Sequence, residues 1–309
     1  MELYTGRTQR IYLDIYVDDE LVNTEVLPSV NIYDNTTDVL IVSGAAKAEI
    51  DNEGHYSYEI RDDYLQVDRE IKAVWNYSYQ GNQMTSVDTY SVVTPYITVS
   101  NAYTRLGFGR EEGDENYVHY HDVQQAEKFA RFMIENYTGM NFGKREASIT
   151  AYGQDADVLF LGERIISLNS LKENGKTVID IFGNINNFGY PVEVTETGFS
   201  IRIVSTDDIN EGGQKDIVYP MIGSFYNGYR YEVRGIFGWR AVPEKVQSAA
   251  LMLMKDYFGK DNIWRARYVN SISFGDTDMQ FSKLAFRGTG NFYVDKLLDE
   301  YKSTNMAVI

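Results

Sequence analysis

The first third of the chain alternates apolar and polar side chains with a period of two. One run places Ile11, Leu13, Ile15 and Val17 on one face of a strand and polar or aromatic residues on the other. A second alternating run begins after a polar turn and carries Tyr56, Tyr58 and Ile60. This period is typical of strands with one buried face. About seven short strands with frequent turns predict a β-sandwich.

A β-hairpin is predicted at the end of this region. Ile71, Ala73 and Trp75 share one face of its first strand, and Gly81-Asn82 is predicted to form the tight turn. Pro95 ends the region because proline cannot donate to a β-ladder. We therefore predict an all-β module over residues 1–95 and a second domain over residues 96–309.

Helical periodicity begins in the second domain. Ser100 is predicted to cap a short helix that ends at Gly107. Asp122 is predicted to cap a longer amphipathic helix that ends at Thr138-Gly139. Its apolar face carries Val123, Ala126, Phe129, Ala130 and Met133, followed by Ile134 and Tyr137.

A third predicted helix starts with Pro243 in its first turn and ends before Gly259. A last helix spans the region around 292–301, and Asn174-Gly175 predicts a further hairpin between the helical segments. The fold class is therefore α+β: an N-terminal sandwich followed by a helical core with inserted hairpins. The apolar face of the third helix carries Val246, Ala249, Ala250, Leu253 and Tyr257.

Composition narrows the functional classes. The chain has 309 residues, a formal net charge of −16, 25 tyrosines and no cysteine. The negative charge argues against ordinary binding to nucleic-acid phosphates. No run approaches the roughly 18 to 20 apolar residues of a membrane helix, and the N-terminus lacks a signal-like apolar stretch. We expect no membrane association and folding in a reducing cytoplasm.

The candidate catalytic and binding residues are few. In a strand, His119 and His121 would share one face and could bind a metal, although two ligands make a weak site. The favoured interpretation is a polar surface pair before the helix. Gly107, Gly109 and Gly113 do not have the spacing of a nucleotide-binding glycine motif.

Asp276 and Asp278 could bind a cation but lack the spacing of an EF-hand loop. Neither a Gly-x-Ser-x-Gly elbow nor a His-Glu-x-x-His helix occurs. We therefore expect no enzyme, no cofactor and no metal.

Four segments between residues 100 and 309 resemble, in the same order, segments of the head–tail adaptor (connector) proteins of tailed bacteriophages. Each is weak alone, and the specificity lies in their combination. They are Val123-x-x-Ala126-x-x-Phe129 through Ile134-Glu135-x-x-Thr138-Gly139-x-x-Phe142, Leu159-Phe160-Leu161-x-x-x-Ile165-Ile166-x-Leu168, Gly235-Ile236-Phe237-Gly238-Trp239-x-x-Val242-Pro243-x-x-Val246-x-x-Ala249, and Ile272-x-x-Gly275-Asp276 followed by Val294-Asp295-x-Leu297-Leu298-x-x-Tyr301. The strand pattern of residues 1–95 is similar to the immunoglobulin-like modules of phage structural proteins, without the cysteines of antibody domains.

This resemblance implies a structural virion protein at the neck, assembled in the host cytoplasm. Copies would close into a ring of about a dozen around the two predicted core helices. The ring would bind the portal protein, present a docking surface to tail, stopper or other neck proteins, and pass double-stranded DNA without specific binding. The resemblance also implies that the C-terminal tail inserts into the portal: Ser303, Thr304, Asn305, Met306, Ala307, Val308 and Ile309.

Two further interpretations concern charge and function. Acidic walls of the channel would repel DNA and let it slide. Alternatively, the net negative charge of the chain only maintains its solubility. The alternatives to an adaptor are a carbohydrate-binding tail or fibre protein, whose tyrosines would stack on sugars, and a stopper or tail-completion protein.

Overall fold

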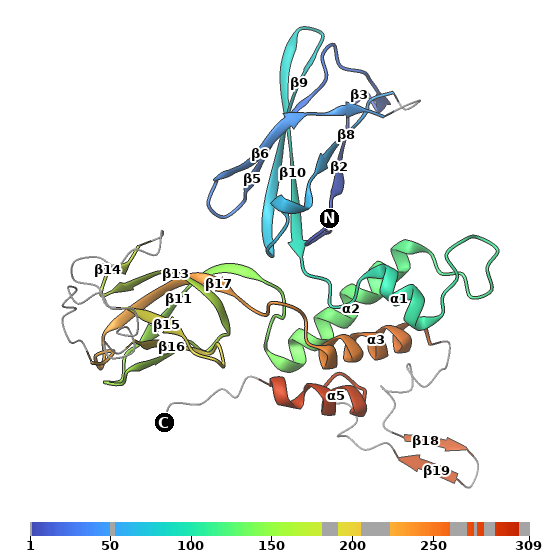
Figure 1. Cartoon of the computed structure of the whole chain (residues 1–309). Helices are drawn as coiled ribbons and strands as arrows, with labels where there is room; N and C mark the ends of the chain where they lie inside the picture. The colour runs from blue at the N-terminus through green and yellow to red at the C-terminus, as the bar shows by residue number, and fades with distance from the viewer. Residues whose placement is uncertain are drawn as a thin grey trace. The chain divides into compact units, whose positions relative to one another are not determined.

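The computed structural model describes residues 2–49, 53–180, 191–204, 223–259, 271–274, 277–280 and 288–302. The fold mixes β-sheets with α-helices, so the predicted α+β class is confirmed (Figure 1). The chain divides into two compact units, each of which makes most of its residue contacts within itself. Unit 1 contains 1–94 and 144–238, and unit 2 contains 95–143 and 239–309. The division at residue 95 into two consecutive domains remains a prediction.

The N-terminal β module of unit 1 consists of two sheets that enclose one core. Their orders are β1-β10-β9-β5-β6 and β2-β8-β7, with β3 and β4 forming a separate pair. The bounds are β1 Glu2–Tyr4, β2 Gln9–Asp14, β3 Tyr16–Val17, β4 Glu20–Leu21, β5 Ser29–Asp34, β6 Leu40–Ala45, β7 Lys47–Ala48, β8 His55–Ile60, β9 Arg69–Tyr79 and β10 Asn82–Val93. The β-rich character is as predicted, and the immunoglobulin-like relationship remains a prediction.

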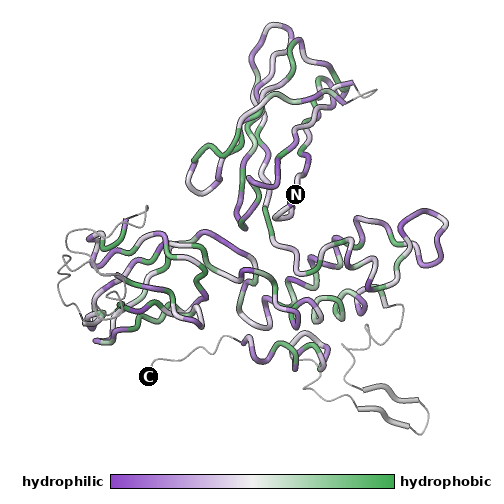
Figure 2. Tube along the Cα trace, viewed as in Figure 1, coloured by the Kyte–Doolittle hydropathy of each residue, from purple (hydrophilic) through white to green (hydrophobic). Residues whose placement is uncertain are grey.

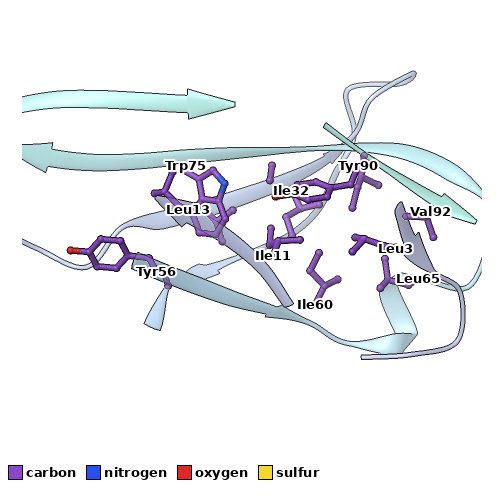
Figure 3. Close-up of a cluster of buried hydrophobic side chains, with 14 of the residues drawn as sticks. Leu3, Ile11, Leu13, Ile32, Tyr56, Ile60, Leu65, Trp75, Tyr90 and Val92 are labelled. Carbon is purple, nitrogen blue, oxygen red and sulfur yellow. The ribbon is translucent and has the colours of Figure 1, made fainter. Parts of the chain in front are cut away.

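The alternating residues meet in the core of this module (Figure 3). Ile11 and Leu13 of β2 face Ile32 and Trp75 of the larger sheet, and all four are buried. The indole N–H of Trp75 donates a hydrogen bond of 3.1 Å to Asp88 Oδ2. The buried indole therefore has a polar partner, as such groups require.

The tight turn between β9 and β10 lies one residue earlier than predicted. Tyr79 pairs with Asn82, so Gln80 and Gly81 occupy the turn, with φ of 49° and 75°. Two successive positive φ angles match the right-handed twist of the paired strands. The prediction of Gly81-Asn82 was wrong because Asn82 already belongs to β10.

The second β module of unit 1 also has its own core, which includes Phe225, Tyr231 and Phe237. Its strands are β11 Arg145–Tyr152, β12 Val158–Phe160, β13 Ile165–Glu173, β14 Lys176–Ile179, β15 Val192–Val194, β16 Ser200–Ile203 and β17 Arg230–Phe237. The sheet orders are β11-β17-β13-β14 and β12-β16-β15. The hairpin predicted at Asn174-Gly175 is confirmed, with φ of 46° and 83° at its turn.

Unit 2 is the helical unit. It contains α1 Val99–Leu106, α2 Tyr120–Thr138, α3 Glu244–Phe258, α5 Phe292–Leu298, the 3₁₀ turn η4 Asp299–Tyr301, and the paired strands β18 Ser271–Phe274 and β19 Thr277–Gln280. Helix α3 packs against α1, α2 and α5. None of the helices in the described part of the chain is long and apolar enough to cross a membrane.

The predicted ends of the first three helices are confirmed, whereas their predicted starts are wrong by one to three residues. The last helix starts at Phe292 as predicted but ends at Leu298, where the 3₁₀ turn η4 follows. Gly107 and Gly139 end α1 and α2 with positive φ, and Gly259 ends α3. Thr98, not Ser100, caps α1 by accepting from the Asn101 amide. Threonine and serine are both good caps, so sequence alone could not separate them.

The start of α2 and the start of α3 need similar corrections. His119, not Asp122, caps α2, and Pro243 is the cap of α3 rather than a residue of its first turn. Asp122 lies in the first turn of α2, where its negative charge still favours the helix dipole.

Candidate interaction surfaces

The residues predicted to form the helical core come together in unit 2. Phe129 and Met133 of α2 are half-buried. The buried members are Val123, Ala126 and Ala130 of α2 and Val246, Ala249, Ala250 and Leu253 of α3. Figure 2 shows apolar and polar residues alternating along the trace of both helices. These side chains therefore stabilise the helical unit itself.

An aromatic cluster in unit 2 joins segments that are distant in sequence. Phe142 is central: its ring centroid lies 5.6 Å from Tyr96, 5.8 Å from Trp239 and 5.4 Å from Tyr301. The chain passes between the two units three times, and each passage lies within two residues of Tyr96, Phe142 or Trp239. The helical unit therefore holds all three connecting segments through one cluster.

Buried polar groups accompany this cluster. The amide of Tyr96 donates a hydrogen bond of 2.8 Å to Glu127 Oε1, and Glu127 is 1% exposed. Arg131 Nε lies 3.6 Å from Glu127 Oε2. The Tyr96 hydroxyl group bonds both Glu135 and the Phe142 amide. Burial raises the pKa of Tyr96, and the neighbouring Glu135 carboxylate raises it further.

Sequence reasoning missed this polar network. A usable signal existed, because Glu127 interrupts the apolar face of α2 between Ala126 and Ala130. A carboxylate at a core position needs a buried partner. Arg131, four residues later on the same helix, is a partner with a local signature. The Tyr96 amide lies about thirty residues earlier in the chain and has none.

The two neighbouring histidines do not lie on a strand. His119 is the residue before α2, and its Nδ1 accepts a hydrogen bond of 3.2 Å from the His121 amide. His121 lies in the first helical turn and is exposed. Both histidines are exposed at the start of α2, in line with the favoured interpretation of a polar surface pair. Within the described ranges, no group of three or more His, Asp or Glu residues is arranged to hold a metal ion.

In the glycine-rich loop after α1, the carboxylate of Asp114 binds two backbone amides of the same loop. Asp114 Oδ2 accepts hydrogen bonds from the amides of Arg110, at 2.8 Å, and Glu111, at 3.0 Å. Both hydrogen bonds lower the pKa of the Asp114 carboxyl group, and the bond from the Glu111 amide has the larger effect. The amides that a phosphate loop would offer to a ligand are occupied by Asp114.

The negative charge is concentrated in the N-terminal module. Residues 1–94 contain 17 acidic and 6 basic residues, a net charge of −11. Residues 95–143 and 239–309, which make up unit 2, together contain 15 acidic and 14 basic residues. The helical unit is therefore nearly neutral.

Large aromatic side chains are exposed on the helical unit. Phe132 of α2 is 61% exposed and points away from the helix's buried face, while Phe292 and Tyr293 at the start of α5 are 66% and 72% exposed. Tyr257 is 42% exposed and lies 5.5 Å from the ring of Phe129. Exposed aromatic residues of this kind are enriched at protein interfaces.

The predicted portal-docking residues 303–309 lie outside the described residues, as does Asp276, and the side chain of Asp278 is not described. The chain just before the tail is held by the helical unit. Lys302 Nζ lies 2.9 Å from Asp299 Oδ1 and 4.0 Å from the centre of the Tyr137 ring.

Comparison with protein-family models and with curated proteins found no match. One similar solved structure is described as the N-terminal domain of phage TP901-1 ORF48. It shares 18% sequence identity, with 29% of this chain and 81% of that chain covered and a TM-score of 0.22. A likeness at this level carries no argument about fold or function.

Proposed function

We propose that this chain is a structural subunit of the neck of a tailed phage, namely a head–tail adaptor. The observation that carries the proposal is the direct packing of α2 on α3. Each helix contains part of one motif that resembles the family, and more than a hundred residues separate the two helices in sequence. Their predicted apolar faces form the core of one helical unit.

The proposed function is geometric and not catalytic. Copies associate around an axis through surfaces outside the helical core, for which Phe132, Phe292 and Tyr293 are the candidates. When two different surfaces of neighbouring copies meet, the copies form a closed ring if the rotation from one copy to the next is a whole fraction of 360°. The ring binds the portal on one side and presents neck or tail proteins with a docking surface on the other.

The charge distribution narrows the proposed role in DNA passage. Because the helical unit is nearly neutral, repulsion of DNA requires that carboxylates of unit 1 line the channel. Reversing acidic residues of the N-terminal module should then slow DNA ejection. Unchanged ejection rates would contradict a role in DNA passage and would favour the alternative, in which the charge of this module serves solubility.

The C-terminal tail is proposed to dock into the portal. A variant ending at Lys302 should lose portal association in a pull-down assay. Its thermal unfolding should match that of the full chain, because the helical unit holds the chain up to Lys302. Undiminished binding by the truncated protein would contradict this role.

A further inference from the structure

Strand β6 is an unusual edge strand. It lies at one end of the five-stranded sheet, and the segment Val39–Ala46 contains no charged residue and no proline. Edge strands of natural proteins usually carry charges or proline, because unpaired backbone groups recruit other strands. Leu40 is 50% exposed, and Ser43 and Ala45 are exposed as well.

The opposite edge of the same sheet is protected. There, the side-chain oxygen Oε1 of Gln9 accepts from the Tyr4 amide at 3.1 Å, and Gln9 Nε2 donates to the Tyr4 carbonyl group at 2.7 Å. The side chain of Gln9 thus satisfies the backbone of Tyr4, the last residue of β1, in the way that a neighbouring strand would. The two edges of one sheet are therefore chemically different.

The backbone groups on the free side of β6 can be identified. The Ala46 amide donates a hydrogen bond of 2.8 Å to the Pro28 carbonyl group, on the side of β5. Because backbone groups alternate along an antiparallel strand, the N–H and C=O groups of Ser43 and Ala45 point away from β5. A register shift at Ile41, between the pairs Ile32–Val42 and Tyr33–Leu40, interrupts this alternation at the start of β6. Ser43 and Ala45 therefore offer hydrogen bonds to an added strand.

We infer that β6 pairs in antiparallel fashion with β6 of a second copy of this chain. A two-fold axis at Ser43 places Ile41 opposite Ala45 and Val42 opposite Gly44. Each large side chain then faces a small one, so the strand is complementary to itself. The Ser43 pair at the axis gives about two backbone hydrogen bonds, and Ala45 extends the pairing on either side.

The charges beside the strand permit this pairing although the whole module is acidic. Asp38 precedes β6 and forms an ion pair with Lys72, and Lys47 follows β6. The surroundings of the edge are therefore close to neutral. Such a contact uses the same patch on both copies, whereas ring closure uses two different patches. The inference therefore stands independently of the proposed adaptor ring.

Cysteine cross-linking tests the register. The chain has no cysteine, so Ser43→Cys introduces one thiol at the proposed axis. Directly paired residues have Cα atoms about 5.5 Å apart, within the range of a disulfide. Mild oxidation should convert Ser43→Cys to a covalent dimer of twice the 35.4 kDa chain mass. Thr85→Cys, exposed on β10 of the same sheet, is the matched control and should remain largely monomeric.

A proline variant tests the pairing without a cross-link. Ser43→Pro removes an amide that points away from β5, so the monomer should keep its circular dichroism and its unfolding midpoint within a few degrees. Its dimer should be lost in sedimentation analysis. Equal cross-linking of both cysteine variants, a monomeric wild-type chain, or a dimer that survives Ser43→Pro would overturn the inference. Portal binding by the Ser43→Pro variant tests the adaptor proposal separately, because that proposal does not require pairing through β6.

Discussion

The Tyr96 hydroxyl group donates a hydrogen bond of 2.7 Å to Glu135 Oε1 and accepts one of 3.1 Å from the Phe142 amide. It thereby links the segment that follows β10 to α2 and to the loop after α2. The ring of Tyr96 also packs edge-on against Phe142. One side chain thus holds two of the three connections between the units.

Replacing Tyr96 with phenylalanine should keep the ring and remove both hydrogen bonds. It leaves the Phe142 amide buried without this partner, so we expect a loss of about 1–3 kcal/mol in the free energy of unfolding. Urea denaturation measures this. Tyr12→Phe, at a tyrosine that is 49% exposed, should change stability by less than about 0.5 kcal/mol. Equal effects of the two variants would contradict the proposed anchoring.

Two adjacent residues of α3 test the packing of the helical unit. Leu253 is 1% exposed and Met252 is 40% exposed. Leu253→Ala should destabilise the protein by about 2–5 kcal/mol, because it leaves a cavity between helices. Met252→Ala changes the same helix on its solvent side and should cost less than about 1 kcal/mol. Thermal unfolding that shows no difference between them would contradict the burial of this face.

Alkaline pH should destabilise the N-terminal module. Burial, with a smaller contribution from Asp88, raises the pKa of Tyr90 from 10.0 to about 12. The unfolded chain therefore loses this proton at a lower pH than the folded chain does. Stability is unaffected below about pH 10 and falls as the pH rises from 10 toward 12. Denaturation midpoints measured across this range, with Tyr90→Phe as the control, test the assignment.

A substitution in the turn between β3 and β4 should make the protein more stable. Asp18 and Asp19 have φ of 51° and 65°, a region that costs a non-glycine residue roughly 1 kcal/mol. Asp19→Gly should therefore raise the free energy of unfolding by up to about 1 kcal/mol. Asp14→Gly, in the neighbouring strand β2, should lower it. A destabilised Asp19→Gly variant would show that the carboxylate itself is needed.

Local patterns predicted the elements of this fold well. The apolar faces of α2 and α3, the glycines that end the helices and the Asn174-Gly175 hairpin all follow from short-range chemistry. Helix starts were less certain because several adjacent residues can cap. His119 caps α2 although histidine is an uncommon cap, whereas the more usual Asp122 follows it.

Long-range pairing could not be predicted. Strand β17 lies between β11 and β13 although some sixty residues separate it from β13. The aromatic cluster likewise joins Tyr96, Phe142 and Trp239, which are far apart in the sequence. No periodicity specifies such contacts. The uncharged run of β6 was visible in the sequence, but its position at a sheet edge was not.

The central proposal concerns assembly on a portal. The most direct measurement is electron microscopy of the purified full chain mixed with portal protein. The adaptor proposal predicts a ring of about a dozen copies bound to one end of the portal, with an open channel. A chain that stays separate from the portal and joins no virus particle would contradict it.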